Sequence, residues 1–507
     1  MPSEQSNAAP ELLLGLDADA RPPGMQQLVR ALRDAVRTGR LHPGARLPAS
    51  RLLADQLGCS RWVVVQAYEQ LTAEGYLDAR VGSGTRVHAL PAARPAPEEA
   101  PAASRSWRFD FRPGIPDLAR FPRSAWLRTV RASFQAAPTA ALDYGDPDGL
   151  PALRASLADY LGRVRGVEAR ARDITVTTGS VNALSVVARA LVARGMNRIG
   201  VEDPSWIPLR GPLAGSGVET VPIPVDDDGL DVDELERSDL RAVLVTPVHQ
   251  FPTGTVLGPE RRRRLLEWAA ERDGLIVEDD YDSEYRYDRT PLGAIQGVAP
   301  DHVLLIGTVS KSLAPALRLG WMVVPRSWAA DLRRARQSVD VGVSVLTQLA
   351  FAEFLGSGAF EQHLRRMRKE YHQRRTALVA TLATHFPTAR VHGIPGGLHV
   401  MVELGTGLTG ADIERRCDAH DIRLYPLGSY CAGPIPPRYR PDTVVLGFGA
   451  IPEHRMAIAV ATMAEVLRDQ SESGERGLAR GDDAGGVRDR DGGDVGVRAE
   501  HENSPVR

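Results

Sequence analysis

Residues 303–325, VLLIGTVSKSLAPALRLGWMVVP, decide the fold of most of this chain. The stretch opens with an apolar run of strand length, passes through small residues to Lys311, and reaches a second apolar run after Arg318. Lys311 is one of two lysines among 62 Lys plus Arg, so arginine is the ordinary cation here. Lysine, unlike arginine, can lose its proton inside a protein and act as a nucleophilic amine. The position after a buried strand therefore favours an amine that binds a carbonyl cofactor covalently; a chance surface lysine is the alternative.

Length and composition limit the class of protein. A chain of 507 residues predicts two or three domains, and an apolar fraction of 43% is typical of globular proteins. A net charge of −2 gives no general attraction to polyanions. Three scattered cysteines predict neither a disulfide framework nor a zinc cluster and favour a reducing compartment. Because no apolar run reaches membrane-spanning length and no signal pattern opens the chain, we expect a soluble cytoplasmic protein.

The first 90 residues contain a basic helical segment. Between Arg21 and Leu90 the chain has ten Arg against five Asp plus Glu. An apolar helical stripe over 25–38 is followed by two predicted helices that begin with Ser50 and Ser60 as caps. These two helices, joined by one Gly-containing turn, predict a helix-turn-helix with Arg61 and Trp62 at the start of its second helix. Residues 77–87 then predict two short strands around Gly82.

The run LPASRLLADQLGCSRWVVVQAYEQLTAEGYLDARVGSGTRV, residues 47–87, resembles the GntR-type winged helix over nearly its whole length. The resemblance implies a DNA-binding domain over 20–88, in which Arg51, Ser60, Arg61 and the wing at Gly82 contact double-stranded DNA. Trp62 stands where a small polar residue is commoner, and there it would stack on a sugar or contact a thymine methyl group. A helical protein-interaction module is the alternative.

The rest of the chain predicts an α/β architecture. An Ala- and Pro-rich linker over 89–107 is expected to be extended. Beyond it, strand-length apolar runs alternate with helical stretches, which predicts a mostly parallel sheet with crossover helices over 108–326. The predicted strands are 174–178, 198–201, 242–246, 275–278 and 303–306. Ligands of such sheets gather at the carboxyl ends of the strands.

Several residues at those strand ends suit one cofactor. Gly179 and Ser180 open a helix whose backbone N–H groups suit a phosphate, and Trp206 offers either a stacking face or core packing. The acidic run that contains Asp279 and Tyr281 lacks the spread of ligands a metal needs, so no metal is expected. A single carboxylate there suits a protonated ring nitrogen, and a phenol suits a ring hydroxyl. Together with Lys311 they describe pyridoxal 5′-phosphate (PLP) bound as a Schiff base.

This second part resembles the fold-type I aminotransferases, and the whole of 24–467 is similar to the MocR-type regulators. The resemblance implies that Lys311 forms the Schiff base and that a homodimer completes the site. By that resemblance Asp279 contacts the pyridine nitrogen, Tyr281 the ring hydroxyl and Trp206 the ring face. The phosphate is held by Gly179, Ser180, Ser310 and Arg318. Tyr144 reaches the phosphate of the neighbouring subunit's cofactor.

A smaller α/β domain is expected over 327–467, followed by a disordered tail over 468–507. Two long helical stretches are predicted within 327–386, with strands over 391–404, 422–426 and 443–448 and helices over 410–420 and 453–467. Aminotransferases commonly hold the substrate carboxylate with an arginine at the position occupied here by Val445. Arg438, Arg440 and Arg210 are the candidate replacements, and loss of a bidentate partner removes a major contact to amino acids.

Two functions remain open at the level of sequence. The leading hypothesis is a dimeric transcription regulator whose PLP-binding domain senses PLP, an amine or an amino acid and changes the spacing of the DNA-binding domains. The alternative is an active aminotransferase that carries a DNA-binding domain. Val445 favours weak or no transaminase turnover. A PLP-storage protein would leave the winged helix unexplained.

Overall fold

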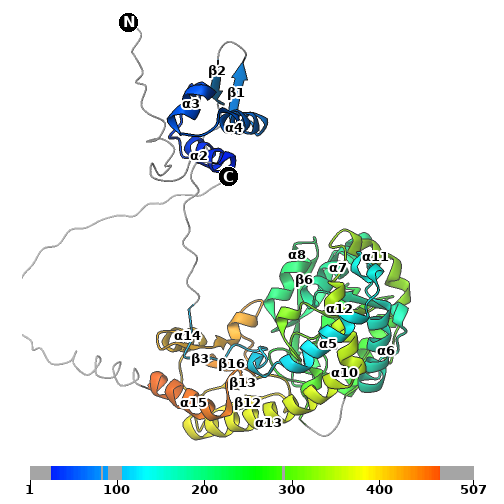
Figure 1. The fold of residues 1–507 in the computed structure, drawn as a ribbon. Coiled ribbons are helices and arrows are strands. Elements are labelled where there is room, and N and C mark those ends of the chain that lie inside the picture. The colour runs from blue at the N-terminus through cyan, green and yellow to red at the C-terminus, as the bar shows by residue number, and fades with distance from the viewer. Residues whose placement is uncertain (1–23, 81–83, 89–104, 288–291, 469–507) are drawn as a thin grey trace, which may run out of the picture. The chain divides into compact units, whose positions relative to one another are not determined.

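The computed structural model describes residues 24–80, 84–88, 105–287 and 292–468. They belong to two compact units that divide after Arg105 (Figure 1). Gly82, most of the predicted linker and the predicted tail beyond Arg468 lie outside the described residues.

The N-terminal unit is a winged helix-turn-helix. Its elements are α2 (Met25–Arg37), α3 (Ser50–Gln56), α4 (Arg61–Ala73), β1 (Leu77–Arg80) and β2 (Gly84–Val87). Leu28, Leu53 and Val64 are buried where the helices meet, and Leu77 pairs with Val87 across the antiparallel wing. Ser60 is the N-cap residue of α4, as predicted, although its side chain makes no capping hydrogen bond. The predicted Ser50 cap is wrong, because Ala49 is the N-cap residue and helix α3 starts at Ser50 itself.

The larger unit is built on an eight-stranded sheet of order β4-β11-β10-β9-β8-β5-β6-β7. Strands β10, β9, β8, β5 and β6 are parallel, whereas β11 runs antiparallel to both β10 and β4. The five predicted strands are therefore confirmed, and their carboxyl ends lie at one edge of the sheet. The bounds are β4 (Ile174–Thr177), β5 (Arg198–Asp203), β6 (Glu219–Asp226), β7 (Gly229–Leu230), β8 (Ala242–Val245), β9 (Leu275–Asp280), β10 (Val303–Thr308) and β11 (Gly320–Val323).

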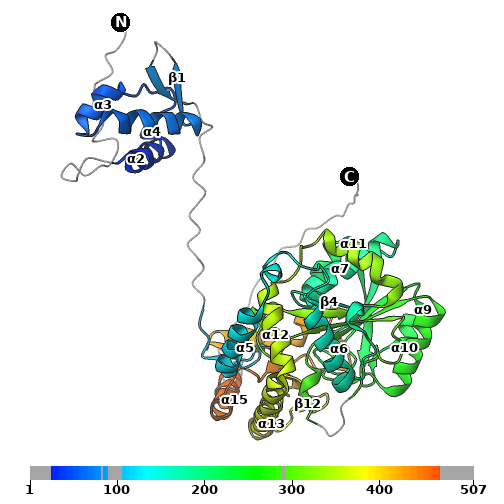
Figure 2. The ribbon, with the colours of Figure 1, turned by 45° about the vertical axis from the view of Figure 1, so that its right-hand side comes forward.

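Helices cover both faces of this sheet (Figure 2). Along β10, Leu304 and Ile306 pack with α7 (Ser180–Ala193), α8 (Arg210–Ala214) and α11 (Ala329–Gln337). Val303 packs on the opposite face with α9 (Val232–Arg237) and α10 (Pro259–Glu271). This alternation explains why the strand is apolar at every position: both of its faces are buried. Helices α5 (Arg123–Ala136) and α6 (Pro151–Arg165) belong to the same part of the chain.

The C-terminal part forms a second sheet of order β12-β13-β16-β15. Its strands are β12 (Arg390–His392), β13 (His399–Glu403), β15 (Tyr425–Pro426) and β16 (Thr443–Gly447), and β14 (Ile422–Arg423) pairs separately with β3 (Phe109–Asp110). The helices here are α12 (Val345–Gly356), α13 (Ala359–His385), α14 (Gly410–Asp418) and α15 (Glu453–Arg468).

Two expectations for this part are corrected. Residues 327–386 contain three helices rather than two, because Ser338–Ser344 interrupts the helical pattern and Ser344 caps α12 through Thr347 N–H. The predicted strand 391–404 is two strands, because positive-φ glycines at 393 and 397 turn the chain between them. The proposed boundary at 326/327 stays a prediction.

A candidate cofactor site at the strand ends

Lys311 lies in the loop after β10 and lines a cavity of about 660 Å³. Burial lowers the pKa of its amine, and the carboxylates of Asp282 and Asp279 oppose that shift. The loop is held in place because the Ser312 carbonyl lies within hydrogen-bond distance of Tyr285 Oη at 3.3 Å and His363 Nε2 at 3.0 Å. A partly buried lysine with a depressed pKa, at the wall of a cavity, is suited to act as a nucleophilic amine.

The phosphate residues named from the sequence meet at one side of this cavity. Helix α7 begins at Ser180, directly after Gly179, whose φ of 119° permits the turn. Ser310 accepts a hydrogen bond from Thr308 Oγ1 at 2.9 Å, and Arg318 adopts φ 48°. The Arg318 guanidinium makes no hydrogen bond or ion pair with the described residues. A helix N-terminus, hydroxyls and an uncommitted guanidinium form a fitting cradle for a phosphate.

Asp279 and Trp206 line the same cavity. Asp279 is buried at the end of β9, accepts a hydrogen bond from Ser180 Oγ at 3.3 Å, and has a pKa raised by burial to about 7. The Trp206 ring centroid lies 5.9 Å from Lys311 Nζ. A buried carboxyl that makes no ion pair with the described residues is suited to a pyridinium nitrogen, and the indole is suited to stack on a planar ring. The residues therefore fit PLP.

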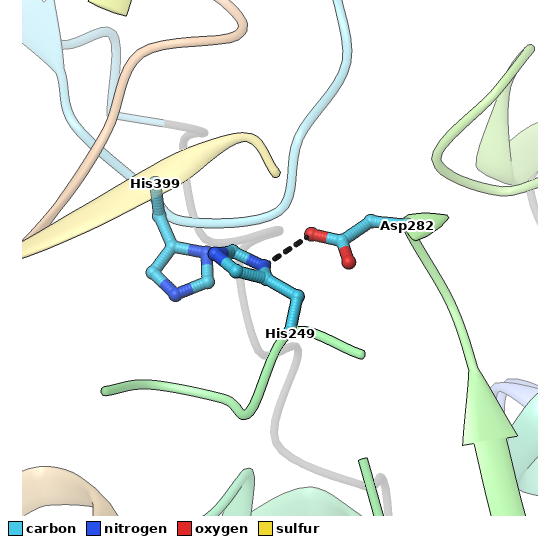
Figure 3. A group of neighbouring side chains, drawn as sticks. All are labelled: His249, Asp282 and His399. Carbon is cyan, nitrogen blue, oxygen red and sulfur yellow. Dashed lines mark hydrogen bonds and ion pairs between the residues drawn. The ribbon is translucent and has the colours of Figure 1, made fainter. Parts of the chain in front are cut away.

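Tyr281 connects the cavity to a buried cluster that sequence reasoning missed. Its hydroxyl donates to the His249 carbonyl at 2.9 Å and lies 3.2 Å from His249 Nδ1. That same Nδ1 lies 2.9 Å from Asp282 Oδ2, and the His399 ring stands 4.9 Å away, centroid to centroid (Figure 3). His249 was visible as a polar residue in the loop after β8. His399 lies inside an apolar strand pattern, which offered no such signal.

Val445, the residue aligned with the carboxylate-binding arginine of aminotransferases, does not line the cavity. Val445 is fully buried in β16 and packs in an apolar cluster with Phe251 and Tyr430. Of the three candidate arginines, Arg210 lines the cavity, where it pairs with Asp203 at 3.2 Å. Arg438 pairs with Asp227 and Arg440 contacts the Thr388 carbonyl, and neither lines the cavity. Arg112, which the sequence did not single out, also lines it.

Tyr144 does not line the cavity of its own chain, and its side chain is 81% exposed. Its role toward the partner subunit's cofactor stays a prediction.

The residues predicted to contact DNA lie at the starts of α3 and α4. Arg51, Ser60, Arg61 and Trp62 are all exposed, and Trp62 is 65% exposed although it is a large aromatic. The Arg61 Nε donates to Ser50 Oγ at 3.4 Å, so the two helix starts are adjacent. The structure thus places these four residues on one exposed surface suited to groove contacts. Gly82 lies outside the described residues.

Comparison with known proteins agrees with both units. Residues 25–87 match the family of bacterial regulatory proteins, gntR family, and residues 117–405 match aminotransferase class I and II. A probable rhizopine catabolism regulatory protein MocR from Rhizobium meliloti is 33% identical over 490 residues, which cover 92% of this chain and 98% of the relative. This chain belongs to the MocR-type regulators of the GntR family.

Other relatives of this MocR-type regulator share its architecture. The pyridoxine biosynthesis transcriptional regulator PdxR of Corynebacterium glutamicum is 38% identical over 380 residues, covering 74% of this chain and 82% of the relative. Among solved structures, Pyrococcus horikoshii kynurenine aminotransferase, in complex with PMP, is 26% identical with a TM-score of 0.65, over 72% of this chain and 92% of that one. The larger unit therefore has the fold-type I architecture, whose solved examples bind PLP-type cofactors.

In the part of the chain that the structure describes, no helix has both the length and the apolar character needed to cross a bilayer.

Proposed function

We propose that this MocR-type regulator is a cytoplasmic homodimer that binds double-stranded DNA and carries PLP on Lys311 as its sensing group. One observation carries the proposal: a winged helix-turn-helix and a cavity that combines Lys311, Asp279 and a phosphate cradle occur in the same chain. Each half alone would suggest a repressor or an enzyme, and their combination favours a regulator whose ligand acts at the cofactor.

PLP, when bound, supplies an aldehyde for the Lys311 amine and an electron-withdrawing ring. The chain's own residues would hold it. Asp279 would place a negative charge at the pyridine nitrogen, Trp206 would cover the ring, and Arg318 with the start of α7 would neutralise the phosphate. The cavity volume of about 660 Å³ lies within the range of small-molecule binding sites.

The cavity favours sensing over turnover. At the place where aminotransferases commonly hold the substrate carboxylate, Val445 lies in an apolar cluster. Arg210 and Arg112 line the cavity but are paired with Asp203 and Asp110. An amino acid would have to displace an existing ion pair, whereas PLP itself or an amine without a carboxylate would not. The name of the PdxR relative, a regulator of pyridoxine biosynthesis, agrees with PLP as the signal.

A homodimer would cover an exposed apolar surface and complete the site. Leu127 and Phe134 lie seven residues apart on α5 and are 65% and 51% exposed, and Tyr144 follows nearby in the chain. Residues seven apart share one face of a helix. Burial of this face against a second copy would remove the apolar side chains from water and would bring Tyr144 to the partner's phosphate.

The first experiment tests the lysine. PLP is added to the full-length protein, the imine is reduced with borohydride, and the modified peptide is identified by mass spectrometry. The expected product is a pyridoxyl group on Lys311, absent from Lys311→Ala and retained in Lys369→Ala, since Lys369 is the chain's other lysine. Modification of Lys369 alone would contradict the proposal.

The second experiment tests regulation. Retardation of the protein's own promoter DNA is measured with and without PLP at low salt. The expected result is a retarded band whose midpoint shifts with PLP in the wild type and not in Lys311→Ala. Steady formation of keto acid from amino acids, with no DNA retardation, would instead favour the aminotransferase.

A further inference from the structure

Glu414 lines the same cavity as Lys311, but it comes from helix α14 of the C-terminal part of the chain. Its carboxylate makes no hydrogen bond or ion pair with the residues that the structure describes. The other two acidic lining residues are engaged, because Glu202 accepts a hydrogen bond from Thr246 and Asp279 accepts one from Ser180. Glu414 therefore faces the cavity without a role in holding the cofactor.

Packing fixes the helix that carries Glu414. A Cβ at Gly410, the first residue of α14, would lie 2.6 Å from Pro426 Cβ, so the helix starts in close contact with β15. Ile413 and Cys417, which flank Glu414 on the same helix, are fully buried. The backbone at Glu414 is thus held by the core, and its side chain is presented to the cavity from a rigid element.

The surroundings of this carboxylate are those of a group that lacks a cation. Burial raises the pKa of the Glu414 carboxyl, and the carboxylate of Asp418, one turn further along α14, raises it further. A nearby positive charge would lower the pKa instead. A cation bound beside Glu414 would offset both the partial loss of water and the repulsion from Asp418.

Two tyrosines line the cavity next to Glu414. Tyr425 and Tyr430 have ring centroids 6.4 Å apart, and Glu414 is close enough to Tyr430 to help raise the pKa of that phenol, which burial raises most. Arg423, whose Nε donates to Tyr425 Oη at 3.0 Å, does not line the cavity. Aromatic rings attract cations, and together with a carboxylate they form a surface suited to an organic ammonium ion.

The arginines that line the cavity are less suited to a ligand carboxylate. Arg210 pairs with Asp203 at 3.2 Å, and the same Asp203 oxygen accepts a hydrogen bond from the Ala432 N–H at 2.7 Å. Arg112 pairs with Asp110 at 2.9 Å. A ligand carboxylate would have to break one of these pairs, whereas an ammonium group at Glu414 would leave both intact.

We propose that Glu414 makes this cavity selective for a diamine, that is, a primary amine with a second ammonium group and no carboxylate. The second ammonium pairs with Glu414 beside Tyr425 and Tyr430, and the first amine lies toward Lys311. Glu414 is then the residue that determines the chemical class of the sensed molecule. This inference rests on the proposed attachment of PLP to Lys311, which defines the end of the cavity that the cofactor fills.

The test compares three ligands that differ at one end only: 1,4-diaminobutane, butylamine and 4-aminobutanoate. Calorimetry measures their binding to the full-length protein loaded with PLP, and the visible absorbance of the cofactor is recorded in parallel. The diamine should bind about tenfold more tightly than butylamine, because a hydrogen bond between charged groups is gained. It should also bind more tightly than the amino acid. The comparison is repeated with the homologues one carbon shorter and one carbon longer.

Variants of α14 assign the preference to one side chain. Glu414→Gln should bind the diamine only as well as butylamine, and Glu414→Lys should reverse the preference in favour of 4-aminobutanoate. Asp418→Asn is the matched control, because it removes an equal charge one turn away from a residue that does not line the cavity. It should keep the preference for the diamine. An unchanged unfolding midpoint of Glu414→Gln shows that the fold is intact.

Three results would overturn the inference. The first is that at every chain length the diamine binds no better than butylamine, or does not bind. The second is equal loss of the preference in Glu414→Gln and Asp418→Asn. The third is tighter binding of the amino acid, which would assign its carboxylate to Arg210, whose Nε is buried without a hydrogen-bond partner among the described residues. If borohydride traps no PLP on Lys311, the proposed function itself fails, and this outcome is distinct from all three.

Discussion

At the scale of single residues, the chemistry of this chain depends on charges removed from water. Burial raises the pKa of Asp279 to about 7 and also raises that of Glu278 to about 7, although the two side chains have different surroundings. Asp279 faces the cavity, whereas Glu278 accepts backbone hydrogen bonds inside the fold. One carboxyl is thereby prepared for a cation, and the other is a structural group. Their effects should separate under mutation.

Asp279→Asn should weaken PLP binding by about tenfold or more. A carboxylate beside a pyridinium favours its protonated form, and loss of the interaction costs about 1.4 kcal/mol for each tenfold change. The affinity is measured by titration of the imine absorbance in the full-length protein. Binding that equals the wild type would show that Asp279 does not meet the ring nitrogen.

The raised pKa of Glu278 predicts that the difference in stability between the wild type and Glu278→Gln depends on pH. Its folded pKa of about 7 lies above the ordinary glutamate value, so the unfolded chain releases its proton first as pH rises. Relative to Glu278→Gln, the wild type should therefore lose stability between about pH 4.5 and about pH 7, by up to about 3 kcal/mol. The measurement is denaturant unfolding of both proteins at each pH. A difference that grows with pH in favour of the wild type would contradict the assigned pKa.

At the scale of elements, strand ends and helix starts carry the function. The sequence pattern predicted the strands β4, β5, β8, β9 and β10 because each is a short apolar run buried on both faces. It also predicted α4, whose buried stripe of Val64, Ala67 and Leu71 leaves Arg61 and Trp62 exposed at its start. The pattern failed where the chain turns within an apolar or helical stretch, as at Gly393 and at Ser344, since local periodicity does not report a tertiary contact.

Arg61→Ala should weaken DNA binding by about tenfold. It should also reduce the slope of the logarithm of the binding constant against the logarithm of the salt concentration by about one, because one phosphate contact is lost. The guanidinium is exposed at the start of α4, so its removal should leave the unfolding midpoint unchanged. The measurement is promoter binding at several salt concentrations. Arg37→Ala, which removes an equal charge from the exposed end of α2, is the control and should bind nearly as the wild type does.

At the scale of the whole molecule, the proposed regulation requires two copies of the chain. The exposed face of α5 and the exposed Tyr144 are explained together if a second copy covers them. The DNA-binding units would then be brought together by the dimer of the larger units, which would link events at Lys311 to the spacing of the units on DNA.

Phe134→Asp should therefore convert the protein to a monomer, because it places a charge in the proposed apolar interface. Light scattering measures the mass. The monomer should also bind PLP more weakly, since Tyr144 of a second copy no longer reaches the phosphate. Tyr144→Phe should weaken PLP binding and leave the dimer intact. A Phe134→Asp protein that remains a dimer would place the interface elsewhere.

Sequence patterns alone predicted the two units and the buried strands, since these depend on local periodicity and turn residues. The rarity of lysine singled out Lys311, whose role stays a prediction. The sequence also indicated Asp279, Tyr281 and Gly179 as candidate cofactor contacts, because residues that follow parallel strands reach one edge of a sheet. The tertiary structure alone decided that His249, Asp282 and His399 meet. They come from three separate segments, and their contact depends on the docking of the second sheet and on the space left by Gly397. Burial of charge is a property of that docking, so no local pattern could have predicted it.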